Sequence, residues 1–231
     1  MKVLVNALSA RMGGIVTYTN NLLDAFERRG IEVIVCVPNE FVTRDRPSVR
    51  HIDIGGYAPA HRFIWEQSVW RRIVSEIKPD ILFSSANFGL LKSPAKQVLL
   101  LREGGLFDPF YLAYMTAPQG LAYVANRFLR RKLMLWSAVH ADHIITPTHA
   151  MRDALALWQP SILEKCTVNR YGTINDIFKP AETRRSWRED GVLRLLYVSV
   201  YYPHKVPSLI SQAVDRLNSG GLAAHGRITM S

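Results

Sequence analysis

The stretch that decides the fold is Met1–Gly30, MKVLVNALSARMGGIVTYTNNLLDAFERRG. Lys2 to Asn6 has the apolar run of a short buried strand, and Ile15 to Arg29 carries apolar residues at helical spacing. A loop with the pair Gly13-Gly14 joins the two, and a second apolar strand follows Gly30. This order predicts a strand, loop, helix and strand in succession, the unit from which parallel sheets covered by helices are built.

Gly13 and Gly14 are candidates for a ligand-binding loop. Glycines let a ligand approach the backbone, and the helix that follows offers free N–H groups and the positive end of its dipole. Such a loop suits an anionic or hydroxyl-rich ligand. The alternative is that the pair only makes a tight turn, because it matches neither the spaced dinucleotide fingerprint nor a P-loop.

The composition narrows the class of protein. The chain has 231 residues, 48% of them hydrophobic, which predicts one large domain or one and a half. No stretch approaches the roughly 20 apolar residues of a membrane span. The N-terminus leads straight into a strand without a signal peptide, and two cysteines, Cys36 and Cys166, indicate neither a disulfide framework nor a zinc site. A cytoplasmic protein is expected.

The net charge of +10 allows three classes of partner: nucleic acid, an anionic membrane surface or a phosphorylated substrate. No zinc-finger, RNP or helix-turn-helix signature supports nucleic acid, so we expect none. Further strands are predicted at 49–54, 80–84, 97–101, 143–147 and 166–169, and helices at 62–77, 117–139 and 150–157. The expected fold class is therefore α/β, a Rossmann-like parallel sheet with helices on both faces.

Four polar residues follow two of the predicted strands. Ser85 and Asn87 come after the strand at 80–84, and Arg102 and Glu103 come after the strand at 97–101. Ligands of open α/β sheets bind at the carboxyl ends of the strands. We therefore expect these four residues to share a cleft beside the glycine pair. The alternative for Arg102 and Glu103 is a local ion pair on a loop.

The predicted helix at 117–139 is basic. Arg127, Arg130, Arg131 and Lys132 stand among large apolar residues, a pattern that suits peripheral contact with an anionic membrane, such as the inner face of a cell membrane. The alternative is a helix packed on the core with a solvated basic face.

The sequence predicts a second domain after residue 192. We expect an N-terminal Rossmann-like domain at 1–180, a linker at 181–192, and the beginning of a second Rossmann-like domain at 193–231. The second part contains a strand at 193–198, a helix at 207–217 and the start of a strand at 227–230. A lone strand and helix cannot bury a core, so this domain is expected to be cut off soon after it begins.

Taken together, the chain resembles the retaining glycosyltransferases of family 4, which have the two-domain GT-B architecture. The resemblance runs over nearly all of the sequence. Four segments carry it: Met12-Gly13-Gly14, His143–Thr148, Asn169–Pro180 and Leu195–Lys205. The stretch Arg62–Gln67 is similar to one found in some polysaccharide-assembling members.

The resemblance implies hexosyl transfer from a nucleotide sugar to a glycan or lipid-linked acceptor, in polysaccharide or cell-envelope synthesis. It implies that the N-terminal domain holds the acceptor and the C-terminal domain the donor, without a metal or other cofactor. Gly13 and Gly14 would line the cleft, and Lys205 would meet the donor diphosphate. The alternative for Lys205 is an exposed lysine at a helix start. No catalytic residue is assigned.

Three departures from the family pattern bear on activity. Ser199 and Val200 replace the usual glycine and arginine, and Arg102-Glu103 replaces a sugar-contacting histidine. The glutamates that hold the donor would lie beyond Ser231. We therefore expect the isolated chain to be inactive. The competing hypothesis is a truncated, non-catalytic module that binds a glycan or a protein partner; a sugar-nucleotide epimerase is disfavoured by the segment Tyr171–Pro180.

Overall fold

The computed structural model describes residues 1–54, 59–111, 113, 119–172, 191–199 and 206–230. It divides into two compact units, Met1–Tyr171 and Gly172–Ser231. The predicted domain edge at 180 and most of the predicted linker lie outside the described residues, as do Lys205 and most of the family-like segment Asn169–Pro180.

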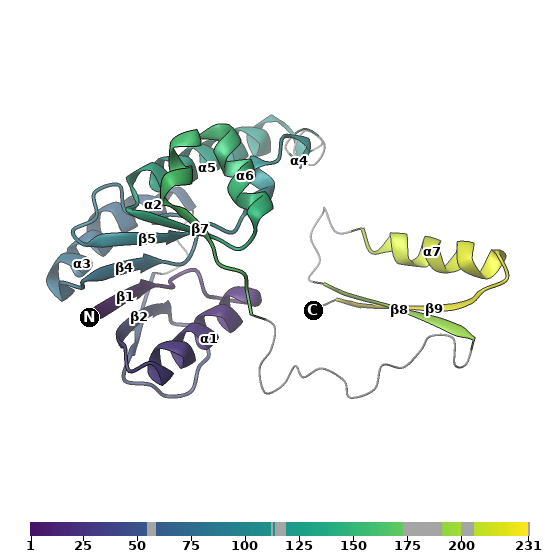
Figure 1. The fold of residues 1–231 in the computed structure, drawn as a ribbon, viewed down its shortest axis with the longest axis horizontal. Helices are drawn as coiled ribbons and strands as arrows, with labels where there is room; N and C mark the ends of the chain where they lie inside the picture. The colour runs from purple at the N-terminus through teal and green to yellow at the C-terminus, as the bar shows by residue number, and fades with distance from the viewer. Residues whose placement is uncertain (55–58, 112, 114–118, 173–190, 200–205, 231) are drawn as a thin grey trace. The chain divides into compact units, whose positions relative to one another are not determined.

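The first unit is built on a seven-stranded parallel sheet with the order β3-β2-β1-β4-β5-β6-β7 (Figure 1). Its strands are β1 (Lys2–Asn6), β2 (Glu32–Pro38), β3 (Val49–Ile52), β4 (Ile81–Ser84), β5 (Lys96–Leu100), β6 (His143–Thr146) and β7 (Cys166–Val168). The predicted strands and the α/β, Rossmann-like fold class are confirmed, with strand ends shifted by one or two residues. The direction of winding reverses beside β1, between β1 and β4, which is the usual ligand position in such sheets.

Helices connect the strands. They are α1 (Gly14–Arg28), α2 (Pro59–Trp65), a π-helix η1 (Glu66–Trp70), α3 (Arg71–Ile77), a 3₁₀ turn η2 (Gly104–Phe107), α4 (Pro109–Tyr111), α5 (Leu121–His140), α6 (His149–Trp158) and a 3₁₀ segment η5 (Pro160–Lys165). The helix predicted at 62–77 is thus interrupted by a π-helical segment, and the one predicted at 117–139 begins only after Gly120, whose φ is 91°. Thr148 caps α6 by accepting a hydrogen bond from the Met151 N–H at 3.1 Å.

Both faces of the sheet are covered because its strands are apolar on both sides. On β1, Val3 and Val5 pack with Leu23 of α1, whereas Leu4 packs with Trp70 and Val74 of η1 and α3. On β5, Leu99 joins a third cluster with residues of α5 and α6. Alternate side chains of a strand point to opposite faces, so the continuous apolar runs in the sequence reflect this double burial.

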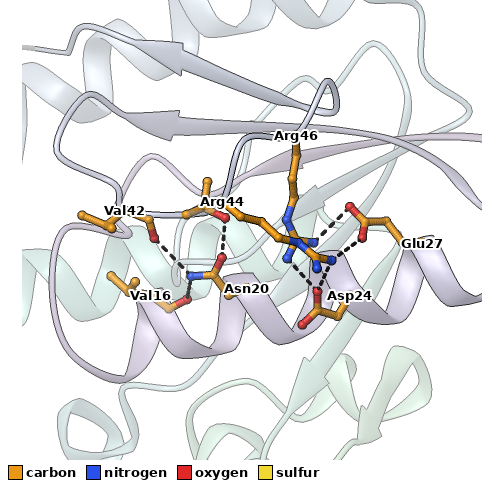
Figure 2. Close-up of polar contacts among 8 residues, drawn as sticks. Val16, Asn20, Asp24, Glu27, Val42, Arg44 and Arg46 are labelled. Atoms are coloured by element: carbon orange, nitrogen blue, oxygen red, sulfur yellow. Dashed lines mark hydrogen bonds and ion pairs between the residues drawn. The ribbon is translucent and has the colours of Figure 1, made fainter.

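The loop between β2 and β3 is fixed to α1 by a charged network (Figure 2). The Arg46 guanidinium donates to Asp24 at 2.6 Å and to Glu27 at 3.0 Å, and Arg44 donates to the same two carboxylates at 3.1 and 2.9 Å. Asn20 of the same helix contacts the carbonyl oxygens of Val16 and Val42. The network ties this loop to the middle and end of α1.

The second unit contains β8 (Val192–Ser199), α7 (Ser208–Ser219) and β9 (Ala223–Met230), and its two strands pair in parallel. The three predicted elements are confirmed, with longer strands. Several large apolar side chains are exposed here, among them Leu196, Val198 and Leu209. Of the residues described in this unit, Ala224 is the only buried apolar one, so the unit as described has little core of its own.

Candidate functional site

A pocket of about 400 Å³ lies in the first unit, where β1, β4 and β5 end. Asn6 ends β1, Ser9 and Arg11 follow it, Asn87 follows β4 and Arg102 follows β5. The remaining walls come from α1, from α2 with η1, and from α5: Ile15, Arg62, Phe63, Glu66, Asn126, Leu129, Arg130 and Leu133. The pocket therefore occupies the sheet edge at which the sequence predicts a site, beside the reversal of strand order.

Asn87 fixes the backbone immediately after the end of β5. It has a φ of 66°, a left-handed conformation that asparagine tolerates better than most residues. Its side-chain oxygen accepts hydrogen bonds from the N–H groups of Arg102 at 2.8 Å and Glu103 at 3.2 Å, and its Nδ2 donates to Glu103 at 3.4 Å. Asn87 thus orders the strand end that carries Arg102 and also lines the pocket itself.

Arg102 supplies a partly buried cation to the pocket. Among the described residues, its guanidinium has no hydrogen-bond or ion-pair partner, so its charge is available to a ligand. It also lies near the Tyr18 hydroxyl of α1. Burial, with a smaller contribution from Tyr171, raises the pKa of Tyr18 to about 12, while the positive charge of Arg102 opposes this rise. Tyr18 and Tyr171 make an edge-to-face contact with ring centroids 5.4 Å apart.

Glu103 does not pair with its neighbour Arg102 in the described structure. Its carboxylate accepts from Arg127 at 3.3 Å and from Arg130 at 2.7 Å, both on α5. The local ion pair considered from the sequence is therefore wrong. Instead, Glu103 joins the end of β5 to α5, and it holds Arg130 at the pocket wall, where the guanidinium lies 5.2 Å from the centre of the Phe88 ring.

These contacts also change the interpretation of the basic helix. Arg127 and Arg130 pair with Glu103, and Arg131 is 6% exposed, with its guanidinium 3.7 Å from the centre of the Trp158 ring. Of the four basic residues, only Lys132 is exposed. The alternative from the sequence is a helix packed on the core with a solvated basic face. Its packing is confirmed, because Met134 and Ala138 of α5 are buried in the core, but its basic face is not solvated at the three arginines, which make intramolecular contacts. No helix among the described residues is long and apolar enough to cross a membrane.

Glu66 and Arg62 are site residues that the sequence analysis did not select. The Arg62 Nε donates to the Glu66 Oε1 at 3.0 Å, one helical turn apart, and both line the pocket. Burial raises the pKa of the Glu66 carboxyl, although Arg62 partly offsets this rise. The signal that could have found them is the family-like stretch Arg62–Gln67, whose π-helical segment begins at Glu66. Such segments are frequent at functional sites.

The other predicted site residues lie in different environments. Gly13 precedes α1 with a φ of 70°, and a side-chain carbon added at Gly13 or Gly14 would meet nothing within 4 Å, so a ligand could approach both. Ser85 is buried, and its hydroxyl donates to the Asn6 carbonyl oxygen at 2.8 Å rather than lining the pocket. The predicted donor contact, Lys205, lies outside the described residues.

The site therefore combines cations, amides and apolar walls in one cavity. Of the described residues, four arginines and one glutamate line it, together with three asparagines and a serine. Guanidinium groups bind anions, and amide groups bind hydroxyls. Within the described ranges, no group of three or more His, Cys, Asp or Glu side chains is placed to hold a metal ion.

A parallel sheet covered on both faces, with a polar pocket where the strand order reverses, defines a ligand-binding α/β domain of the doubly wound class. The comparison with known families makes the assignment specific: the family model for Glycosyltransferase Family 4 matches residues 12–168. The chain belongs to glycosyltransferase family 4. Among curated proteins, none matches it by sequence.

Solved structures agree on the fold. Sucrose-phosphate synthase from Thermosynechococcus elongatus matches with a TM-score of 0.59 and 13% identity, over 100% of this chain and 70% of that one. The lipopolysaccharide outer core galactosyltransferase WaaB, in its apo form, matches with 0.55 and 12%, over 99% and 60%. S. aureus MnaA, in complex with UDP, matches with 0.56 and 14%, over 100% and 62%. The chain thus spans about three fifths of the length of the latter two.

Proposed function

We propose that this chain is the acceptor-binding part of a glycosyltransferase that moves a hexose, with retention of configuration, from a nucleotide sugar to a glycan or lipid-linked acceptor. The observation that carries the proposal is the pocket at the ends of β1, β4 and β5, most of whose lining residues fall within residues 12–168, the segment that the family model matches. In this proposal, Asn6, Asn87 and Asn126 bind acceptor hydroxyls, and the acceptor serves polysaccharide or cell-envelope synthesis.

The nucleotide sugar is assigned to the second unit. A departing nucleoside diphosphate gains negative charge, and positioned cations stabilise it. In the proposal, the positive charge of Lys205 stabilises the departing diphosphate, and no metal ion takes part. We further propose that the chain alone does not transfer sugar, because the described part of its second unit has only one buried apolar residue, Ala224, and so offers little preformed structure for a donor.

The test is hydrogen exchange of the full 231-residue chain with candidate acceptor glycans and, separately, with UDP-sugars. Acceptor binding is expected to slow exchange in residues 86–88 and 121–133. The control variant is Arg71→Gln, which removes an exposed arginine outside this pocket and should leave the protection by the acceptor unchanged. Protection of the pocket by UDP-sugars and not by any glycan would assign the pocket to the donor and contradict the proposal.

The alternative is a non-catalytic module that binds a glycan or a protein partner. It is favoured by the small core of the described second unit and by Ser199 and Val200 in the family's glycine-arginine position. A chimera separates the two functions. In the chimera, residues 172–231 are replaced by the donor half of a family 4 enzyme, and hexosyl transfer is measured with and without EDTA. Transfer supports a transferase, and transfer that persists in EDTA supports a reaction without a metal ion. Glycan binding without transfer supports the module.

A further inference from the structure

We propose that the acceptor carries a phosphate or diphosphate on an apolar chain, and that Arg102 is the residue that selects the phosphate. This inference rests on the function proposed above and specifies the substrate class of the same pocket. Two separate features support the inference. The first is an unbalanced positive charge inside the cavity, and the second is a row of apolar side chains that continues from the cavity along α5.

The charge argument begins with the arginines of the pocket. Arg62 is paired with Glu66 at 3.0 Å, and Arg130 shares Glu103 with Arg127 and lies 2.7 Å from it, so each of these two pocket arginines already has a carboxylate partner. Arg102 has no such partner among the described residues and is partly buried. An unpaired, partly desolvated guanidinium is unfavourable until an anion neutralises it, and phosphate oxygens match its fork of donors. A neutral sugar would leave this charge unbalanced.

The second argument comes from the apolar wall. Phe63 and Phe88 meet edge to face in the pocket, with ring centroids 5.9 Å apart. Leu129 and Leu133 of α5 also line the pocket. Residues three and four apart lie on one side of a helix, so the same side continues to Trp136, which is 51% exposed. Leucine side chains offer hydroxyls no hydrogen-bonding partner, and this row of apolar side chains therefore suits a hydrocarbon chain better than a sugar chain.

The experiment measures the binding of three probes to the full chain by calorimetry: farnesyl diphosphate below its micelle-forming concentration, farnesol, and inorganic pyrophosphate. Farnesyl diphosphate is expected to bind at least tenfold more tightly than either of the others. Arg102→Gln should lower the affinity for farnesyl diphosphate and pyrophosphate at least tenfold and leave farnesol unchanged. Trp136→Ala should weaken farnesyl diphosphate and farnesol and leave pyrophosphate unchanged.

Arg28→Gln is the matched control, because Arg28 is an exposed arginine in the last turn of α1 and its replacement removes the same charge. The chain has a net charge of +10 and attracts anions in general, so equal losses from Arg28→Gln and Arg102→Gln would overturn the inference. So would equal affinity for farnesol and farnesyl diphosphate, or for pyrophosphate and farnesyl diphosphate.

The failure of this inference is distinguishable from failure of the proposed function. If an unphosphorylated oligosaccharide slows exchange in residues 121–133 and farnesyl diphosphate does not, the phosphate inference is overturned and the acceptor site stands. If neither probe slows exchange around the pocket, both proposals are overturned.

Discussion

At the scale of single residues, Asn87 and Glu66 show how the pocket is shaped by side chains under constraint. Asn87 adopts a left-handed backbone and uses its amide to hold two N–H groups at the end of β5. Glu66 is 5% exposed, and among the described residues Arg62 is its charged partner. The left-handed backbone of Asn87 and the burial of the Glu66 carboxyl each cost free energy of folding, so substitutions at these two residues test the structure directly.

Replacing Asn87 separates its backbone role from its side-chain role. Asn87→Gly removes the hydrogen bonds and should lower the free energy of unfolding by about 1–2 kcal/mol. Asn87→Ala removes the same bonds and adds the strain of a left-handed alanine, for a total of about 2–4 kcal/mol. Urea unfolding followed by circular dichroism measures both. Equal losses for the two variants would contradict the positive φ.

Glu66 should make stability depend on pH. Because burial raises the pKa of its carboxyl above the ordinary value, the folded state holds this proton more tightly than the unfolded state does. The stability linked to this proton is fully present below the ordinary pKa and is lost as the pH rises through the raised value. Relative to Glu66→Gln, the wild-type free energy of unfolding should therefore fall with rising pH, by up to about 1.4 kcal/mol per unit within that window.

The measurement is urea unfolding of both proteins at several pH values from 4 to 8. Glutamine has nearly the same shape and can still accept the hydrogen bond from Arg62, so the variant isolates the titration. A constant difference between the two proteins across this range would show that Glu66 is not the titrating group.

At the scale of elements, one helix and one loop determine the shape of the pocket and its support. The π-helix η1 lies between α2 and α3 and places Glu66 in the pocket wall, while the next residue, Gln67, bonds to the backbone of Gly89 and Leu91. One helical segment thereby fixes the loop after β4. The loop after β2 is fixed in another way, by the charged network on α1 shown in Figure 2.

The two arginines of that network should differ in their contribution to stability, although they share both carboxylates. Arg44 has 66% of its side chain exposed and Arg46 only 6%. Arg44→Ala should therefore lower the free energy of unfolding by no more than about 0.5 kcal/mol, as for most surface pairs. Arg46→Ala removes a buried cation with two partners and should lower it by about 2 kcal/mol or more.

Thermal and urea unfolding of the two variants at low and high salt provide the measurement. The loss for Arg44→Ala should shrink further in high salt, because exposed charges are screened. Equal losses for the two arginines would show that burial does not govern this network.

At the scale of the whole molecule, the two units differ in how much apolar surface they bury. The first has three buried clusters around a seven-stranded sheet. The described part of the second has two strands, one helix and exposed large side chains such as Leu196 and Leu209. Since burial of apolar surface supplies most folding stability, local stability should be unequal.

Hydrogen exchange of the free chain tests this inequality. Amides of β1 and β4 should exchange at least tenfold more slowly than those of β8 and β9, because the former lie in a covered sheet and the latter in a pair of edge strands. Mass spectrometry of peptides from each strand gives the rates. Comparable protection in the two units would show that the second is stabilised by contacts beyond those described here.

The sequence predicts the order of elements and the edge of the sheet that carries the site. Apolar runs and helical spacing are local properties, with periods of two and 3.6 residues, so they identify β1, α1 and β2 before any contact is known. The rule that ligands bind at the carboxyl ends of parallel strands then brings Asn87 and Arg102 to one rim, and both line the observed pocket.

The partners of each polar side chain were decided only by the tertiary structure. Glu103 meets Arg127 and Arg130 across 24 and 27 positions of sequence, and Ser85 meets Asn6 across 79. Nothing in the local pattern distinguishes a buried serine from one facing a ligand, or an arginine held by a carboxylate from one left free. Those outcomes depend on how helices pack on the sheet, because a charge or hydroxyl finds its partner in space and not along the chain.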